Sequence, residues 1–210
     1  MLTNLLQEET RTYYDRLERS PLLHMLASEA LSHRLYMATL GVQYGFYAPL
    51  ENRLLALVDW WTLGFDLEAR LKTPLLAADL AHYGLDGELL RALPSCPSLP
   101  RIVELPAALG CLYVLESCTL TGQVIARQLA GSLGLDADHG AAFFNSYGLH
   151  LGAQWRAFRS FLDHTGTGHE DAVIAAASAT YAALESWYST SYRAIVGTRL
   201  PTPRYVATLC

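Results

Sequence analysis

The chain has 210 residues, of which 51% are hydrophobic and 17% charged, so one domain can bury a sizeable core without disulfide or metal support. Its formal net charge is −5, with Lys72 as the single lysine and no basic run, which argues against a nucleic-acid partner. Twelve Tyr, six Phe and four Trp make the chain rich in aromatic residues, which is compatible with an apolar cavity.

The N-terminal stretch MLTNLLQEETRTYY has neither the basic n-region nor the apolar core of a secretory signal. Apolar runs such as ELPAALGCLYVLE are too short to span a bilayer, so we expect no membrane partner. The four cysteines (Cys96, Cys111, Cys118 and Cys210) show no CxxC and no zinc-site spacing. We therefore expect reduced thiols in a cytoplasmic protein.

The N-terminal quarter of the chain is predicted to be helical. Apolar residues at helical spacing predict a helix over residues 2–18, and Ser-Pro at 20–21 closes it or starts a turn. A second helix is predicted over residues 22–44. Gly45 and Pro49 then interrupt the pattern, so we expect a kink near Gly45 and a new helix from Pro49.

The rest of the chain continues in helical segments. Short helices are predicted at 66–71, 74–83 and 86–93, followed by a surface loop at 94–100. Residues 103–133 predict one long helix or two abutting helices interrupted near Gly122, and residues 135–164 and 169–192 have helical periodicity. No segment alternates with period two for long enough to form a strand. The sequence therefore predicts an all-α fold with a single domain over residues 1–210.

The stretch LGCLYVLESCTLTGQVIARQL, residues 109–129, is the most informative one. It is an apolar helix in which small and hydroxyl residues gather around Gly122. A glycine inside a helix costs about 1 kcal/mol relative to alanine, so it is expected where the backbone bends or where a flat group approaches closely. A close helix–helix crossing at Gly122 is the alternative.

This stretch resembles the distal helix of bacterial heme oxygenases, especially those that accompany bacteriophytochromes, in which LYVLE precedes a small-residue stretch ending in Gly-Gly-Gln. Other segments agree with the family in the same order, and the resemblance covers roughly residues 5–190. These segments are TRTYYDRLE, YGFYAPLE, RLKTPLLAADLAHYG, FFNSYG and QWRAFRSFL.

The resemblance implies a heme-oxygenase-like fold that binds a tetrapyrrole between its first helix and the helix of Gly122. In the family, a histidine of the first helix ligates the iron, and glycines of the distal helix let the backbone contact the porphyrin. Heme is cleaved with O₂ to biliverdin, CO and iron. Heme, an electron donor and a bilin-binding photoreceptor are thus the implied cofactor and partners, besides the small hydrophobic or tetrapyrrole ligand itself.

Several positions depart from the family pattern. Tyr14 occupies the place of the ligand histidine, Ser117 and Thr121 replace two distal glycines, and Gly122 is kept. Cys118 falls where some heme oxygenases have a catalytic aspartate. A tyrosine ligates ferric iron only as tyrosinate, and Ser117 and Thr121 add volume on the heme side, so we expect poor heme turnover.

Arg159 and two histidines are further candidate ligand residues. Arg159 matches a basic position that meets a heme propionate in the family; a surface arginine on an amphipathic helix is the alternative. His24 and His33 lie on the helix after Tyr14, where solvated or hydrogen-bonded histidines are the alternative.

Two other functions stay open at this stage. One is a non-catalytic protein that binds a bilin or another hydrophobic ligand. The other is a heme-oxygenase-like diiron oxidase, for which the pairs Glu29/His33 and Asp79/His82 have helical spacing.

Overall fold

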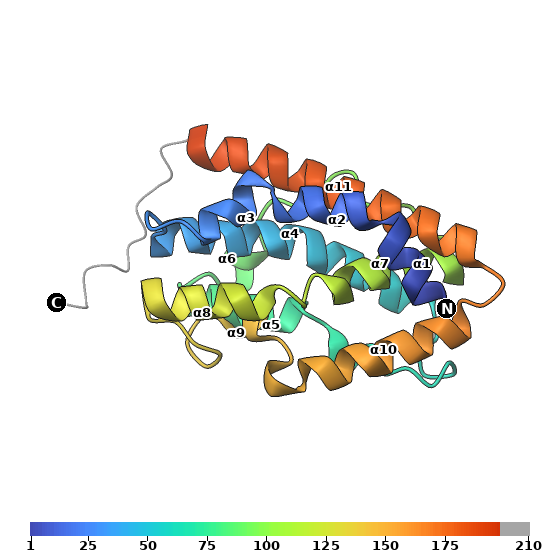
Figure 1. Cartoon of the computed structure of the whole chain (residues 1–210). Coiled ribbons are helices and arrows are strands. Elements are labelled where there is room, and N and C mark those ends of the chain that lie inside the picture. The colour runs from blue at the N-terminus through green and yellow to red at the C-terminus, as the bar shows by residue number, and fades with distance from the viewer. Residues whose placement is uncertain (198–210) are drawn as a thin grey trace.

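The computed structural model describes residues 1–197, which form a compact arrangement of helices without a strand, as the sequence predicts (Figure 1). The helices differ widely in length, from three residues to 28. They are α1 (Leu2–Glu9), α2 (Arg11–Glu18), α3 (Pro21–Leu26), α4 (His33–Leu57), η1 (Glu68–Arg70), α5 (Thr73–His82), α6 (Gly87–Arg91), α7 (Leu105–Ser117), α8 (Gly122–Leu133), α9 (Ala142–Asn145), η2 (Gly148–His150), α10 (Leu151–Thr165) and α11 (Glu170–Gly197).

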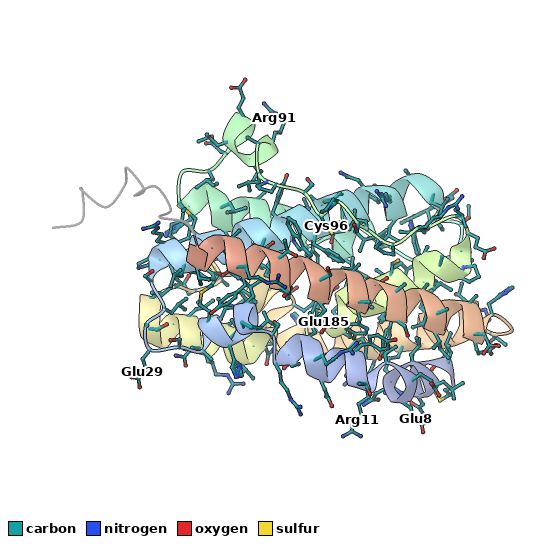
Figure 2. The ribbon with its side chains drawn as sticks, turned by 90° about the horizontal axis from the view of Figure 1, so that it is seen from above. Glu8, Arg11, Glu29, Arg91, Cys96 and Glu185 are labelled. Atoms are coloured by element: carbon teal, nitrogen blue, oxygen red, sulfur yellow. The ribbon has the colours of Figure 1, made fainter. Side chains whose placement is uncertain are left out.

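Helix α7 lies at the centre of the molecule, where every residue from Ala108 to Ser117 is buried. The long α11 packs along α7 and also contacts α2, α3 and α4 (Figure 1). Helix α10 runs on the opposite side and contacts α1 and α7. The short α6, with Arg91, stands away from this body (Figure 2). The end of α7 is therefore enclosed by elements from both ends of the chain.

The predicted helix over residues 2–18 is two helices, α1 and α2, separated at Thr10. Thr10 is buried, and its hydroxyl donates to the carbonyl oxygen of Leu6 at 2.6 Å. Side-chain bonds of this kind to the preceding turn compete with regular helix geometry.

The predicted helix over residues 22–44 is also wrong in its extent, because residues 27–32 interrupt it. Ser20 caps α3, whose first residue is Pro21, as its oxygen accepts from the amide of Leu23 at 3.5 Å. Ser32 caps α4 in the same way through the amide of Leu35, at 3.3 Å. Serine oxygens at this position satisfy amides that a helix start leaves without partners.

The expected new helix from Pro49 is wrong, since α4 runs without interruption through Gly45 and Pro49. Pro49 has no amide hydrogen, so the carbonyl of Gly45, four residues earlier, loses its helical partner. The amide of Cys96 donates to this carbonyl at 2.8 Å. A Cβ atom on Gly45 would lie 2.2 Å from the carbonyl oxygen of Pro94, so only glycine admits the 94–96 loop here.

The C-terminal half agrees better with the sequence. The interruption near Gly122 is confirmed, since α7 ends at Ser117 and α8 begins at Gly122. Residues 135–164 are helical only in part, because α9 has four residues and α10 begins at Leu151. Gly134, with a positive φ, ends α8, and Gly140 and Gly148, in the irregular stretches before α9 and at the start of η2, also have positive φ.

One helical stretch, Leu105–Leu133, is long and apolar enough to cross a membrane by length and composition, contrary to the sequence-based expectation. It comprises α7, the turn after it and α8, and 61% of its most apolar window is buried inside the molecule. The core helix of a folded protein has the same character.

Candidate ligand-binding cleft

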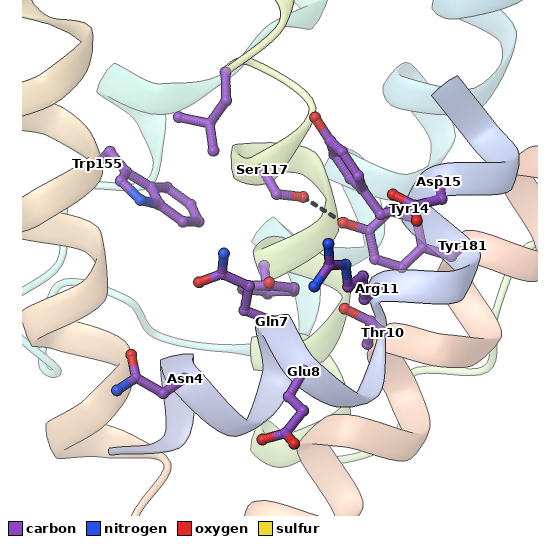
Figure 3. A pocket seen from close by; sticks show the side chains of 12 residues that line it. Asn4, Gln7, Glu8, Thr10, Arg11, Tyr14, Asp15, Ser117, Trp155 and Tyr181 are labelled. Carbon is purple, nitrogen blue, oxygen red and sulfur yellow. Dashed lines mark hydrogen bonds between the residues drawn. The ribbon is translucent and has the colours of Figure 1, made fainter. Parts of the chain in front are cut away.

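A cleft of about 640 Å³ opens between the first two helices and the end of α7 (Figure 3). Its wall combines side chains of α1 and α2 with those of α7, α10, α11 and the turn after α7. The lining residues are Asn4, Gln7, Glu8, Thr10, Arg11, Tyr14, Asp15, Tyr113, Ser117, Leu120, Trp155 and Tyr181. The first two helices and the end of α7 thus face each other across a cleft, as expected. The cleft is not apolar throughout, however. Its α1–α2 side borders solvent and carries amides and charges.

Tyr14 lies at the inner end of the α1–α2 side. Its ring meets that of Tyr181 edge to face, with centroids 6.3 Å apart and an interplanar angle of 88°. Burial, with a further contribution from the charge of Glu18, raises the pKa of the Tyr14 phenol well above its usual value. Tyr14 is therefore a neutral phenol at neutral pH.

The two arginines that are close to Tyr14 in sequence, Arg11 and Arg16, lie in different surroundings. Arg16 points away and pairs with Glu185 of α11 at 3.3 Å. Arg11 lies at the mouth of the cleft, on the same side as Gln7 and opposite Trp155 (Figure 3). Position 11 thus faces the ligand space and position 16 does not.

Ser117 forms the inner wall, where it is 3% exposed. Its hydroxyl donates to the carbonyl oxygen of Val114 at 2.9 Å, which leaves the Tyr181 hydroxyl to donate to Ser117 at 2.7 Å (Figure 3). This pair ties the end of α7 to α11. The added volume at position 117 is thus used in a contact between helices.

Cys118, Thr121 and Gly122 do not line the cleft. The Cys118 side chain packs against the core, where burial raises the pKa of its thiol to about 12. Thr121 precedes α8 and its side chain lies beside the Tyr14 phenol. A Cβ atom on Gly122 would lie 2.6 Å from the carbonyl oxygen of Phe144, so this glycine admits the backbone of α9. Gly122 therefore serves a close crossing of two helices, which was the alternative to close approach of a flat ligand.

Arg159 connects α10 to the N-terminus and does not line the cleft. Its Nη2 donates to Oδ1 of Asn4 at 2.8 Å, and its Nε donates to the hydroxyl of Thr3 at 3.3 Å. Because Asn4 is a lining residue, Arg159 fixes one edge of the cleft from behind.

Glu116, one residue before Ser117, anchors the same end of α7 in a buried charge network. Its Oε2 accepts from Arg70 at 3.0 Å, and its Oε1 accepts from the Tyr147 hydroxyl at 2.6 Å. The Lys72 ammonium lies 3.6 Å from Oε1 and donates to the Tyr147 hydroxyl at 2.8 Å. Burial lowers the pKa of Lys72, opposed mainly by the charge of Glu116.

Sequence reasoning missed most of the lining residues, among them Gln7, Trp155 and Tyr181. A signal for Gln7 exists in the spacing Gln7, Arg11, Tyr14, which places all three on one helical face. Trp155 and Tyr181 come from distant helices, and only the tertiary fold brings them to the cleft.

The histidines and the proposed diiron pairs lie elsewhere. His24 is exposed on α3, and His33 bonds the Tyr83 hydroxyl at 3.0 Å. The Asp79 carboxylate accepts from the backbone amides of Ala142 and Phe143, at 2.8 and 2.9 Å. Within residues 1–197, no group of three or more His, Cys, Asp or Glu side chains is placed to hold a metal ion. The diiron interpretation has no support from this arrangement.

An all-helical chain with a small-molecule cleft between its first helices and the end of a central helix has the architecture of a heme oxygenase. The family model for heme oxygenase matches residues 1–190, and the chain belongs to this family. Membership supports, in general terms, a role in binding and degrading heme.

Solved structures show the same fold. The heme oxygenase of Neisseria meningitidis, determined with NO and CO bound, superposes with a TM-score of 0.72 at 20% identity, over 100% of this chain and 99% of that one. The heme oxygenase of Leptospira interrogans gives a TM-score of 0.70 at 16% identity, over 90% and 98%. No curated protein matches the sequence.

Proposed function

We propose that this protein binds a tetrapyrrole in the cleft without histidine ligation and that it turns heme over poorly. Family membership supports the ligand class, and a cleft of about 640 Å³ has the size of a small-molecule site. One observation carries the second half of the proposal: Tyr14 is a neutral phenol in a cleft that no histidine lines.

The lining residues do not fit an axially ligated iron. Among residues 1–197, no imidazole, thiol or thioether lines the cleft, and a phenol ligates iron well only after it loses its proton. The raised pKa of Tyr14 opposes that loss, although an iron ion at the site would favour it. Binding therefore rests on the organic part of the ligand.

That organic part meets suitable groups on three sides. The Arg11 guanidinium, at the mouth, suits a ligand carboxylate, to which it can donate two parallel hydrogen bonds. Trp155 and Tyr113 offer aromatic surface to a flat conjugated system. The Tyr14 hydroxyl can both donate and accept a neutral hydrogen bond.

The same neutral phenol favours a second candidate, a non-catalytic cytoplasmic protein that binds a bilin. A bilin offers lactam oxygens and pyrrole N–H groups, which pair with a hydroxyl. A bilin-binding photoreceptor is the partner that this candidate requires, whereas heme turnover requires an electron donor.

Titrations with hemin, metal-free protoporphyrin IX and biliverdin, followed by absorbance and by quenching of tryptophan fluorescence, test the proposal. We expect saturable binding of at least one metal-free tetrapyrrole and a hemin spectrum without histidine ligation. Arg11→Gln should weaken all three ligands, while Arg91→Gln, on α6 away from the cleft, should leave them unchanged. Absence of binding by all three tetrapyrroles would refute the proposal. A hemin spectrum of histidine ligation that persists in Tyr14→Phe would refute the assignment of position 14.

A further inference from the structure

A second groove, of about 470 Å³, lies between the end of α4 and η1. Its floor is apolar, with Leu55, Val58 and Trp60 among the lining residues. Its rim carries Trp61 and Glu68. No residue of the groove lines the ligand-binding cleft, so the two sites are separate.

Trp61 is 80% exposed, although it belongs to a well-anchored turn. Its neighbour Trp60 is buried, and the Trp60 indole N–H donates to the carbonyl oxygen of Leu54 at 2.8 Å. Phe65, at the other end of the turn, stacks on Phe161 with centroids 4.2 Å apart. An exposed tryptophan on a fixed backbone loses little conformational freedom when a partner covers it, which is typical of binding hot spots.

The charge around the groove has one sign. Asp59, Asp66 and Glu68 line it, and no lysine or arginine of the part of the chain that the structure describes does so. The carboxyl end of α4, at Leu57, adds the negative end of a helix dipole. Arg70 lies over the ring of the groove residue Phe65, 4.9 Å from its centroid, but its side chain is only 10% exposed and its charge is paired with the buried Glu116 at 3.0 Å. An occupant of this groove must therefore bring positive charge.

We infer that the groove is a docking site for a protein partner that presents an arginine next to an aliphatic side chain. The guanidinium stacks on the Trp61 indole, where a cation over the aromatic face is favourable, and faces the Glu68 carboxylate. The aliphatic side chain covers Leu55 and Val58. The carboxylates disfavour an anionic membrane, and a net charge of −5 on each chain disfavours a second copy.

NMR of the full-length protein labelled with ¹⁵N tests this inference, because each of the four tryptophans gives one indole signal. Trp61→Phe identifies the signal of Trp61. The probe is an acetylated, amidated peptide of alternating leucine and arginine, and the comparison peptide carries citrulline, the neutral isostere of arginine. We expect a saturable shift of the Trp61 indole signal with the arginine peptide and at least about fivefold weaker binding of the citrulline peptide.

Two variants and the salt dependence complete the test. Glu68→Gln should weaken the arginine peptide about threefold, and raising the ionic strength from about 0.01 to about 0.15 M should weaken it further. Leu89→Ala, at an exposed leucine of α6, should leave binding unchanged.

Four results would overturn the inference. They are an unmoved Trp61 signal, equal binding of the citrulline peptide, a Trp61 shift that depends on protein concentration without peptide, and binding to phosphatidylcholine–phosphatidylglycerol vesicles that Trp61→Ala abolishes. The third result would assign the groove to a second copy of the chain and the fourth to a membrane surface.

Discussion

Tyr14 stands where the sequence resemblance implies a histidine, and a tyrosine differs from a histidine in charge as well as in shape. A ligand tyrosinate needs a nearby cation or the metal itself to lower its pKa, yet here burial and Glu18 both raise it. Arg16, one helical turn away at most, is paired with Glu185 on another face. The surroundings of position 14 therefore keep the phenol protonated, and the residue acts through its hydroxyl and its ring.

Tyr14→His should convert the cleft into a heme site with histidine ligation. The imidazole would enter at the family's own position and suits both oxidation states of iron, so hemin affinity should rise about tenfold or more. Hemin titrations in the ferric and ferrous states measure this. Tyr13→His is the matched control, because the Tyr13 ring packs under the Arg16 guanidinium at 4.9 Å, away from the lining residues. Equal hemin spectra of the two variants would contradict the prediction.

The Ser117–Tyr181 hydrogen bond should contribute measurably to stability. Ser117→Ala leaves the Tyr181 hydroxyl without its partner and should lower the free energy of unfolding by about 1 kcal/mol. Tyr181→Phe should cost less, because the Ser117 hydroxyl keeps its bond to Val114. Urea unfolding of both variants and of the double variant gives the coupling energy, which we expect at about 0.5–1 kcal/mol. A coupling energy of zero would mean that the pair contributes nothing.

The thiols of Cys111 and Cys118 should be unreactive in the folded protein. Burial raises their pKa values to about 11 and about 12, so only about one thiol in a thousand or fewer is a thiolate at pH 8. A short iodoacetamide pulse followed by mass spectrometry should label both residues far more slowly than in urea. For the same reason Cys118 cannot stand in for a catalytic carboxylate. Labelling of Cys118 at its unfolded rate would contradict this prediction.

At the scale of elements, the boundaries that the sequence could predict are those with a local cause. Gly122 and its hydroxyl neighbours interrupt the apolar pattern, and α7 and α8 separate there. The continuity of α4 has a distant cause, since the amide of Cys96 supplies the hydrogen bond that Pro49 removes. The periodicity of the sequence around Pro49 predicts an interruption, because it contains no information on the amide of Cys96, some fifty residues further along the chain.

Two glycines of α4 should respond in opposite directions to alanine. A Cβ atom on Gly45 would lie 2.2 Å from the Pro94 carbonyl oxygen, so Gly45→Ala must displace the loop and its bond from Cys96. We expect a loss of about 1–3 kcal/mol of unfolding free energy. On Gly41 the nearest atom, of Leu93, is 3.7 Å away, so Gly41→Ala should be neutral or stabilise by up to about 1 kcal/mol. Urea unfolding of both variants measures these changes. Equal stabilities would contradict the prediction, because they would show that the 94–96 loop moves aside without a cost in free energy.

On the scale of the whole molecule, the family's fold is present, and the cleft is lined by residues other than those that the resemblance implies for an iron site. The ordered motifs predicted the all-α architecture and the opposition of the first helices to the distal segment. Of the six predicted site residues, the cleft is lined by Tyr14 and Ser117. The other four fill contacts between helices or the core, as with Gly122 against α9. Spacing along one helix cannot show such partners, because they come from elements far apart in the chain.

The wild-type protein should therefore form little or no biliverdin when it is given heme, a reductant and O₂. A neutral Tyr14 is a poor iron ligand, and the Ser117–Tyr181 pair occupies the wall where the resemblance implies a glycine. Absorbance spectra during the reaction, with catalase present to remove peroxide, measure the product. Tyr14→His should give more biliverdin than wild type but less than an ordinary family member, because Ser117 remains. Adding Ser117→Gly frees the wall and also removes the bond to Tyr181, so the double variant should gain turnover and lose about 2 kcal/mol of stability. Biliverdin formation by wild type at the rate of an ordinary heme oxygenase would show that the protein holds heme iron by some other residue.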